Sequence, residues 1–280
     1  MPPLVAIVAQ GAMGAGLAQV LTDHGVRVLT TLTGRSVASR ERAVAAGMQP
    51  VELAQLADAD FLLSVLPPGC ALEFAGEVAG LLAGAPRKPV FVDCNAVSPQ
   101  TVQSIEQMIA GAGIAFADVG IIGLPPSFGS PGPHLYAAGT AAAALDTLKI
   151  YGLDIRRLDG PAGTASALKM AYAGITKGLL AVGTAMILGA SRAGVADALY
   201  REMTESQFLL LQALSKRTPD MLPKTYRWVE EMQQIAGFVS AEPGASELYR
   251  GASDLFAHIA ADLQGDRTAV AMLTGFFAAH

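Results

Sequence analysis

The segment Gly163–Arg192 reads GTASALKMAYAGITKGLLAVGTAMILGASR, and it decides how the rest of the chain is interpreted. Ala, Leu and Met dominate it and it contains no proline, so it is predicted to be one long helix. Pro161 and Gly163 mark its start. At about 1.5 Å per residue such a helix spans roughly 45 Å, the width of a domain. The chain before it alternates short apolar runs with helical segments, and the chain after it is helical only. We therefore place this helix between two domains.

Two lysines, Lys169 and Lys177, lie within this mostly apolar helix. A lysine on a helix often keeps its ammonium group in water while its stem covers apolar surface. Alternatively, a lysine whose pKa is lowered by burial can exchange a proton with a substrate. Helical geometry predicts the residues that share the face of Lys169, at increasing angles from it: Thr176 (about 20°), Ala173 (about 40°), Tyr172 (about 60°) and Lys177 (about 80°).

Composition narrows the class of protein. A length of 280 residues favours about two domains, and 52% hydrophobic with only 15% charged residues predicts a large buried core. The net charge of −5 argues against nucleic acid or an anionic membrane as the main partner. Cys70 and Cys94 form no CxxC pair, so we expect reduced, buried thiols in a cytoplasmic protein. The start MPPLVAIVAQG is not typical of a signal peptide, and the uncharged part Gly178–Ser191 is shorter than a membrane span.

Residues 1–160 are predicted to form a Rossmann-type, doubly wound α/β sheet. Apolar runs predict strands at Leu4–Ala9, Val26–Leu32, Gln49–Val51, Phe61–Leu66, Pro89–Val92, Ala115–Val119, Tyr136–Gly139 and Ile155–Leu158. Helices are expected between them at about Met13–His24, Ala38–Gly47, Cys70–Leu82, Thr101–Ala112 and Ala141–Tyr151, with a loop at Gly120–Gly132. Ligands of such sheets lie beyond the carboxyl ends of the strands. The residues predicted at those ends are Gly11, Arg35, Pro67, Asn95 and Gly123.

The first strand, turn and helix carry a dinucleotide-binding pattern. Written against GxGxxG, the chain has Ala9-x-Gly11-x-x-Gly14, with alanine in place of the first glycine. Such glycines allow a tight turn and a close approach to a pyrophosphate at the helix N-terminus. We therefore predict that a dinucleotide contacts the residues of this turn, namely Gln10, Gly11, Ala12 and Met13.

The end of the second predicted strand indicates which dinucleotide binds. NAD enzymes commonly place a carboxylate there for the ribose 2′-hydroxyl. Here residues 30–36 read TTLTGRS, and no carboxylate occurs before Glu41. The residues Gly34, Arg35, Ser36 and Arg40 would suit a 2′-phosphate, so NADP is predicted. The alternative is that these arginines form an ordinary solvated helix start.

Several ordered motifs resemble the 6-phosphogluconate dehydrogenase and 3-hydroxyisobutyrate (β-hydroxyacid) dehydrogenase superfamily. They are VLPP at 65–68, DCNAVSP at 93–99, ADVGIIG at 117–123, the spacing Gly163-x-x-x-x-x-Lys169, and KMAYAGITKG at 169–178. The resemblance implies that Leu66 and Pro67 pass the nicotinamide half of the cofactor and that Asn95 contacts cofactor and substrate. It further implies that Gly123 holds the substrate carboxylate and that Lys169 is the catalytic acid/base.

The implied activity is NADP-dependent, reversible hydride transfer involving a small hydroxy acid or carbonyl compound. The residues near Lys169 differ from the family pattern. Relatives carry Asn where this chain has Ala173, and phosphogluconate dehydrogenases carry Glu where it has Thr176. Tyr172 could supply a hydroxyl in place of the missing amide, so Tyr172, Ala173 and Thr176 are predicted to line the substrate site. Imine reduction remains an alternative, although imine reductases usually lack the lysine. The second alternative is that the protein binds NADP without catalysing a reaction.

Residues 193–280 are predicted to form an all-helical domain. The expected helices are Asp197–Lys216, Met221–Phe238, Ser246–Gln264 and Thr268–Ala279. This part resembles the helical domain of a bacterial subgroup whose function is unknown, and Glu230-Glu231 lies where β-hydroxyacid dehydrogenases usually carry Lys-Asp. Together with the long linking helix, residues 161–192, this domain is expected to complete the substrate cleft and build a homodimer, with Trp228 and Phe238 either in the interface or in the core. The histidines show no metal-ligand spacing, so no metal is expected.

Overall fold

The computed structural model describes residues 1–127 and 132–278, which form two compact units, Met1–Met170 and Ala171–His280. The division falls inside one continuous helix, α5 (Thr164–Arg192), which confirms the long helix expected from the sequence. Residues 128–131 of the predicted glycine-rich loop and the last two residues, Ala279 and His280, lie outside the described part.

The first unit contains a mixed sheet of eight described strands in the order β3-β2-β1-β4-β5-β6-β7-β8. The strands are β1 (Leu4–Val8), β2 (Arg27–Thr30), β3 (Gln49–Pro50), β4 (Phe61–Ser64), β5 (Val90–Asp93), β6 (Phe116–Ile122), β7 (His134–Ala138) and β8 (Asp154–Arg157). Neighbouring strands pair in parallel except β6 and β7, which are antiparallel. The chain crosses from one side of β1 to the other between β3 and β4, as expected for a doubly wound Rossmann-type sheet.

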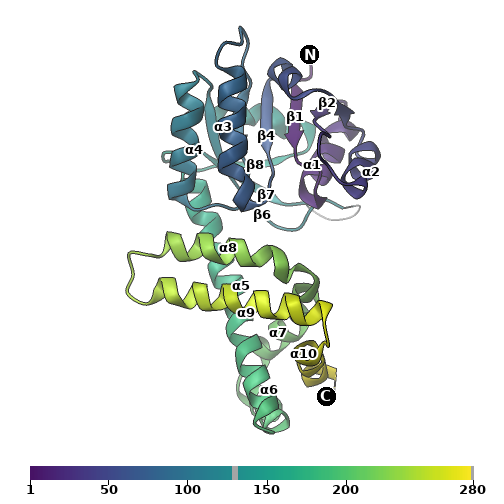
Figure 1. Ribbon diagram of the computed structural model, residues 1–280, viewed down its shortest axis with the longest axis vertical. Coiled ribbons are helices and arrows are strands. Elements are labelled where there is room, and N and C mark those ends of the chain that lie inside the picture. Colours follow the sequence, from purple (N-terminus) through teal and green to yellow (C-terminus); the bar gives the residue numbers. More distant parts are fainter. Residues whose placement is uncertain (128–131, 279–280) are drawn as a thin grey trace. The chain divides into compact units, whose positions relative to one another are not determined.

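Helices cover both faces of this sheet (Figure 1). They are α1 (Ala12–Asp23), α2 (Val37–Ala45), η1 (Leu53–Asp58), η2 (Pro68–Cys70), α3 (Ala71–Leu82), α4 (Pro99–Gly111) and η3 (Ala142–Tyr151). In β1, Val5 and Ile7 pack into one core with α1 and η3, whereas Ala6 and Val8 pack into a second core with α3 and α4. Because alternate side chains point to opposite faces, a strand buried on both sides must be apolar throughout.

The helix expected at about Ala141–Tyr151 is confirmed as a 3₁₀ helix, Ala142–Tyr151, which ends at Gly152 in the left-handed conformation, with φ of 89°. Two other local expectations in this unit were wrong. Gly120 lies within β6, which continues to Ile122, rather than in a loop. Cys70 is exposed rather than buried, because it ends the short turn Pro68–Cys70 instead of starting the following helix. Cys94, immediately after β5, is buried as expected.

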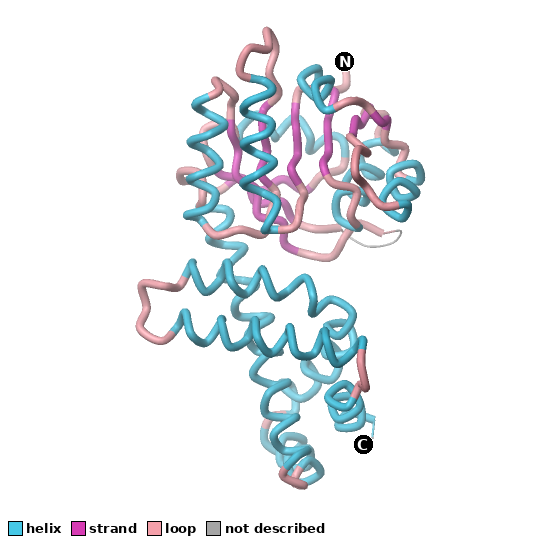
Figure 2. The backbone as a smooth tube through the Cα atoms, viewed as in Figure 1, coloured by secondary structure: helices cyan, strands magenta, loops and turns pink. Residues whose placement is uncertain are grey.

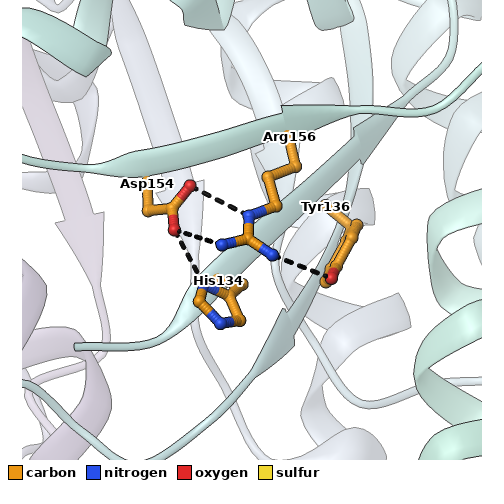
Figure 3. A network of polar contacts seen from close by, with 4 residues as sticks. All are labelled: His134, Tyr136, Asp154 and Arg156. Carbon is orange, nitrogen blue, oxygen red and sulfur yellow. Dashed lines mark hydrogen bonds and ion pairs between the residues drawn. The ribbon is translucent and has the colours of Figure 1, made fainter. Parts of the chain in front are cut away.

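A polar network occupies one face of the sheet edge formed by β7 and β8 (Figure 3). His134 and Tyr136 lie directly opposite Asp154 and Arg156 in the parallel register. Arg156 donates to both oxygens of Asp154, at 3.1 and 2.9 Å, and to the hydroxyl of Tyr136 at 3.3 Å, while Nδ1 of His134 lies 2.7 Å from Asp154. The hydrogen bonds of Arg156 and His134 hold the pKa of Asp154 below its usual value. Such charged pairs stabilise the last strand and protect its open edge from further pairing.

The second unit is all-helical in its described part (Figure 2). Beyond the second part of α5 it contains α6 (Ala196–Ser206), α7 (Phe208–Met221), η4 (Leu222–Lys224), α8 (Thr225–Phe238), α9 (Ala245–Gln264) and α10 (Thr268–Ala278), with α8 and α9 side by side. The single helix expected at Asp197–Lys216 is two helices, because Gln207 leaves the helical region with φ of −138° and ψ of 40°. The helix expected from Met221 starts at Thr225, after a turn that contains Pro223.

Among the described residues, α5 is long and apolar enough to cross a membrane by length and composition. Core helices of soluble proteins meet the same criterion. In each unit, α5 donates a hydrogen bond to a carboxylate of another element. In the first unit, the amide of Ala165 in the first turn of α5 donates to Asp118 of β6. In the second unit, Lys177 donates to Glu231 of α8. These bonds favour its assignment as a core helix.

Candidate active site

The carboxyl ends of parallel strands bring the predicted ligand-binding positions of the first unit to one edge of the sheet. Gly11 follows β1, Arg35 follows β2, Pro67 follows β4, Asn95 follows β5 and Gly123 follows β6. These five strands run in the same direction, so their carboxyl ends meet at the same edge. This is the edge at which doubly wound sheets bind ligands.

The turn between β1 and α1 leaves room for a phosphate group. A Cβ placed on Gly11 would have no atom within 4 Å in the described structure, and Gly11 gives α1 no side-chain cap. The amides of Ala12 and Met13, in the first turn of α1, are therefore available to an anion. Gly14 acts differently, because a Cβ there would lie 1.9 Å from the carbonyl oxygen of Ala9. Glycine at this position allows the helix to pack against the strand.

The side chain of Gln10 is directed into the protein. It is fully buried, and its amide donates to the hydroxyl of Thr30 and, at 2.9 Å, to the carbonyl oxygen of Thr31. Thr30 in turn donates to the carbonyl oxygen of Ile7 at 2.7 Å. The side chain of Gln10 thus connects the ends of β1 and β2, and a contact of this residue with a cofactor stays a prediction.

Arginines surround the loop between β2 and α2. Gly34 adopts a φ of 70°, and Ser36 caps α2 by accepting from the amide of Ser39. The Nε atom of Arg35 is buried and has no hydrogen-bond partner in the described part of the chain. Nε of Arg40 donates to the carbonyl oxygen of Arg35 at 3.2 Å. A buried guanidinium nitrogen without a partner suits an anionic ligand.

Arg42 also belongs to this loop, although no pattern in the sequence marks it. Its Nε donates to the carbonyl oxygen of Gln10 at 2.8 Å, and its Nη2 donates to the hydroxyl of Ser39 at 3.0 Å. Arg42 therefore joins α2 to the glycine turn. Its position could not be read from the sequence, because it meets Gln10 only after α2 has packed beside α1.

Asn95 organises the turn that follows β4. Its side-chain oxygen accepts from the amide of Leu66 at 2.6 Å, and its nitrogen donates to Ser64 at 3.0 Å and to Asp93. Asn95 is buried, and both polar atoms of its side chain are already paired within the protein. In this arrangement Asn95 fixes the backbone of Leu66 and hence the exposed Pro67 beside it, and its contact with cofactor and substrate stays a prediction.

Lys169 lies toward the carboxyl end of β6. The carboxylate of Asp118, within β6, accepts hydrogen bonds from the backbone at Gly163 and Ala165. Two residues farther along the strand, a Cβ at Gly120 would lie 2.5 Å from the carbonyl oxygen of Ala165 and 3.1 Å from the Cβ of Lys169. The helix α5 therefore begins in close contact with β6 and runs in the same direction. This packing places the partly exposed Lys169 near the edge that carries the other predicted residues.

Known proteins share the arrangement of the first unit. Residues 4–149, more than half of the chain, match the NAD binding domain of 6-phosphogluconate dehydrogenase. The chain belongs to this family. Residues 190–259 match a domain of unknown function (DUF1932). The resemblance expected from the ordered motifs is thereby confirmed, and the first unit is an NAD(P)-type dinucleotide-binding domain.

Relatives of this 6-phosphogluconate dehydrogenase-type chain include uncharacterised proteins. One is a 28.5 kDa protein of Methanothermus fervidus, 26% identical over 253 residues, which are 89% of this chain and 96% of that protein. The solved structure of the conserved protein MTH1747, of unknown function and described as similar to 3-hydroxyacid dehydrogenases, has a TM-score of 0.68 and 26% identity, covering 93% of this chain and 98% of its own. The 3-hydroxyisobutyrate dehydrogenase of Mycobacterium tuberculosis, solved with L-serine, shares the fold, with a TM-score of 0.73, 18% identity and coverage of 99% and 100%.

A pair of buried aspartates in this 6-phosphogluconate dehydrogenase-type domain was not identified from the sequence. Asp93 and Asp118 occupy paired positions on the neighbouring strands β5 and β6. Burial, together with the charge of Asp118, raises the pKa of Asp93 to about 8, and its Oδ2 has no hydrogen-bond partner among the described residues. Burial also raises the pKa of Asp118, although the hydrogen bonds that it accepts from Ser166, Gly163 and Ala165 act to lower it. At neutral pH Asp93 is therefore mainly protonated.

The remaining predicted residues differ in exposure. Gly123, at the end of β6, is exposed and has a φ of 133°, which favours glycine. Tyr172, Ala173 and Thr176 belong to the second unit. Tyr172 is exposed, and the hydroxyl of Thr176 donates to its carbonyl oxygen at 2.8 Å. Ala173 is only 1% exposed, and its place in the lining of the substrate site stays a prediction.

Lys177, placed by the helical geometry at the margin of the site, pairs within the second unit. Its ammonium group donates to Glu231 and lies 4.8 Å from the ring centroid of Trp228. The side chains of the ion pair are 15% and 9% exposed. Trp228 also packs against Phe256, so it is a half-buried part of this unit's own packing.

Proposed function

We propose that this protein is an NADP-dependent oxidoreductase of the β-hydroxyacid dehydrogenase type. It would transfer hydride reversibly between the nicotinamide and a small hydroxy acid or carbonyl compound, with Lys169 as acid/base. The observation that carries the proposal is the packing of α5 on Gly120, which supports a position for Lys169 at the carboxyl edge of a dinucleotide-binding sheet. A lysine in that position can exchange a proton with a ligand bound at the edge.

The choice of NADP rests on the loop between β2 and α2. A 2′-phosphate would bind beside Arg35, Ser36, Arg40 and Arg42, where the Nε of Arg35 has no hydrogen-bond partner in the described chain. The pyrophosphate would bind the open N-terminus of α1 at Gly11, Ala12 and Met13. NADP supplies the hydride acceptor, and NADPH the hydride donor.

The residues of the chain supply orientation and proton transfer. During oxidation the uncharged amine of Lys169 would accept the proton of the substrate hydroxyl as the hydride leaves the same carbon, and during reduction its ammonium form would return that proton. The backbone at Gly123 would bind the substrate carboxylate. Tyr172 and Thr176 would border the substrate, and the exposed Tyr172 hydroxyl is the better polar contact because Thr176 donates within its own helix.

Assembly and location form part of the proposal. On α5, the exposed residues Ile175, Leu179, Val182 and Met186 recur at helical spacing, and Leu248 of α9 is exposed beside a groove of about 610 Å³ between these helices. A monomer would leave this surface in water. We propose that it packs against a second copy in a two-fold homodimer, with an interface above about 2,000 Å² as obligate dimers have. A cytoplasmic location agrees with two cysteines that are free.

The test is a spectrophotometric screen at 340 nm. NADPH and NADH are offered in turn with panels of 2-oxo and 3-oxo acids, aldehydes and cyclic imines, and the reverse reaction is followed with hydroxy acids and NADP. The proposal predicts turnover of a carbonyl or hydroxy acid substrate with a preference for NADPH. Turnover of imines alone would favour an imine reductase. Tight NADPH binding without turnover of any panel member would favour a non-catalytic binding protein.

A further inference from the structure

We infer that Asp118 and Ser166 are positioning residues for Lys169: they fix the first turn of α5 on β6 and thereby hold the lysine at the edge of the sheet. This inference rests on the proposed function of Lys169, although the attachment of the helix can be measured without activity. Neither residue needs to touch a substrate or a cofactor for this effect.

The first part of the attachment is a set of hydrogen bonds to one carboxylate. Oδ2 of Asp118 accepts from the amides of Gly163 at 2.8 Å, Ala165 at 3.0 Å and Ser166 at 3.1 Å. Oδ1 accepts from the hydroxyl of Ser166 at 2.6 Å. Both oxygens therefore bond to the start of α5, and the negative charge lies at the positive end of the helix dipole.

The second part is a backbone contact one helical turn later. At Gly120 the backbone of β6 is so close to α5 that a Cβ would lie 2.5 Å from the carbonyl oxygen of Ala165. The same Cβ would lie 3.1 Å from the Cβ of Lys169. Asp118 and Gly120 are two residues apart on one strand, so their side-chain positions share a face of the sheet. Together they prevent α5 from sliding along β6 or rotating about its own axis.

Comparison with other helix starts separates this arrangement from simple capping. The helices α2 and α4 are capped by their own preceding residues, Ser36 and Ser98. The start of α5 is held instead by a residue 45 positions earlier, on a central strand of the sheet. Asp118 is fully buried and Ser166 is 1% exposed. A local hydroxyl would satisfy the helix end at smaller desolvation cost, so what the carboxylate adds is a fixed connection to the sheet.

The chain also contains a matched control. The carboxylate of Asp262 caps α10 by accepting from the amides of Ala269 at 3.1 Å and Val270 at 2.8 Å. Asp262 lies in the second unit and is partly exposed. The variants Asp118→Asn and Asp262→Asn therefore remove the same kind of helix-capping charge, but only the first helix start leads to Lys169.

The experiment measures turnover and the environment of Lys169 in these two variants. For Asp118→Asn, kcat per folded molecule should fall about ten- to a hundred-fold, because a displacement of about 1 Å can have that effect, with little change in NADPH affinity. Amide hydrogen exchange at 164–168 should accelerate, and the ¹³C signal of dimethylated Lys169, assigned with Lys169→Arg, should shift. Asp262→Asn should leave kcat and the Lys169 signal unchanged.

The results distinguish positioning from ordinary stabilisation. If Asp118→Asn lowers only the melting temperature, with unchanged kcat per folded molecule and an unchanged Lys169 signal, the inference is overturned. If Asp118→Asn does not fold, Ser166→Ala is measured instead, since it keeps the three amide bonds and should produce smaller changes of the same kind. If the wild-type protein turns over no substrate, the proposed function fails, but the exchange and ¹³C measurements still decide whether Asp118 and Ser166 fix the lysine.

Discussion

The two lysines of α5 have different surroundings, although one helix carries both. Lys169 packs against Gly120 of the sheet and is near the predicted ligand-binding edge. Lys177, a little more than two turns later, donates to Glu231 and lies over the ring of Trp228. The first lysine therefore lies near the predicted ligand-binding edge, whereas the second packs within the second unit. Residue type and helical spacing alone could not separate them, because the difference arises from the elements that pack against each end of the helix.

Among the substitutions, the largest loss of stability is expected at Lys177. The variant Lys177→Met leaves the carboxylate of Glu231 in a largely buried position without this counter-charge, so the free energy of unfolding should fall by about 3–5 kcal/mol. Urea denaturation measures the change. The double variant Lys177→Met/Glu231→Leu should recover much of the loss. If Lys177→Met is as stable as the wild type, Lys177 does not stabilise the second unit and its contrast with Lys169 fails.

The next largest effect concerns the buried aspartates beneath the first end of α5. Since the pKa of Asp93 is about 8 in the folded protein and about 3.8 for a free side chain, the folded state binds more protons between these values. The free energy of unfolding should therefore fall as the pH rises from about 4 to 8, by at most about 1.4 kcal/mol per pH unit, and then level off. Asp93→Asn should flatten this slope.

The contribution of Asp262 to the free energy of unfolding should depend on pH in the opposite direction. Desolvation alone would raise its pKa, but the combined hydrogen bonds from Val270, Ala269 and Asp266 outweigh that effect and lower it. The contribution of Asp262 to stability is present above a pH of about 4 and is lost as the pH falls through the pKa of the folded state. Asp262→Asn should therefore change the free energy of unfolding only on the acidic side of the pH profile. Thermal melting in buffers from about pH 3 to pH 9 tests both variants. An unchanged slope in Asp93→Asn would contradict the protonated, buried aspartate.

A smaller effect is expected on cofactor affinity. Removing one charge-assisted contact in Arg35→Ala or Arg42→Ala should weaken NADPH binding about ten- to a hundred-fold and NADH binding much less. The control is Arg87→Ala, because Arg87 pairs with Asp60 before the amino end of β4, away from the carboxyl edge. Fluorescence titration gives the dissociation constants. Equal affinity of the wild type for NADPH and NADH would rule out the 2′-phosphate site.

The smallest effect on folding is expected on the exposed side of the second part of α5. Val182 is 51% exposed in the single chain, so Val182→Asp should change the free energy of unfolding of the monomer by less than about 0.5 kcal/mol. It should nevertheless convert the proposed dimer into a monomer of 28.8 kDa in sedimentation equilibrium at low micromolar concentration. Val44→Asp, at an exposed position of α2, is the control and should remain dimeric. A wild-type monomer with full turnover would exclude the dimer as a functional requirement.

Periodic and local signals predicted the architecture well. The alternation of apolar runs and helices identified the doubly wound sheet, and the composition of residues 163–192, rich in Ala, Leu and Met and without proline, identified the long helix. The break at Gln207 was missed because neither glycine nor proline accompanies it. The exposure of Cys70 was missed because it depends on the residue at which a short turn gives way to a helix, and helix ends carry the weakest sequence signal.

The contacts within the candidate site were much less predictable. Asp118 bonds to a helix start 45 residues away, and Arg42 reaches Gln10 across two elements, so neither contact has a local sequence signal. Gln10 was expected to contact a cofactor because it lies in the glycine turn, and Asn95 because of the family resemblance of its motif. Both turn inward, since each satisfies neighbouring buried polar groups that only the folded sheet brings together.

The proposed role of Lys169 can be tested most directly by comparing Lys169→Met with Lys177→Met on the best substrate from the 340 nm screen. Methionine keeps an apolar stem and removes the amine. Turnover per folded molecule should fall by about a hundred-fold or more in Lys169→Met, with NADPH affinity retained, and should change little in Lys177→Met. Normal turnover in Lys169→Met would contradict the proposal and would leave Lys169 as a lysine whose stem covers apolar surface.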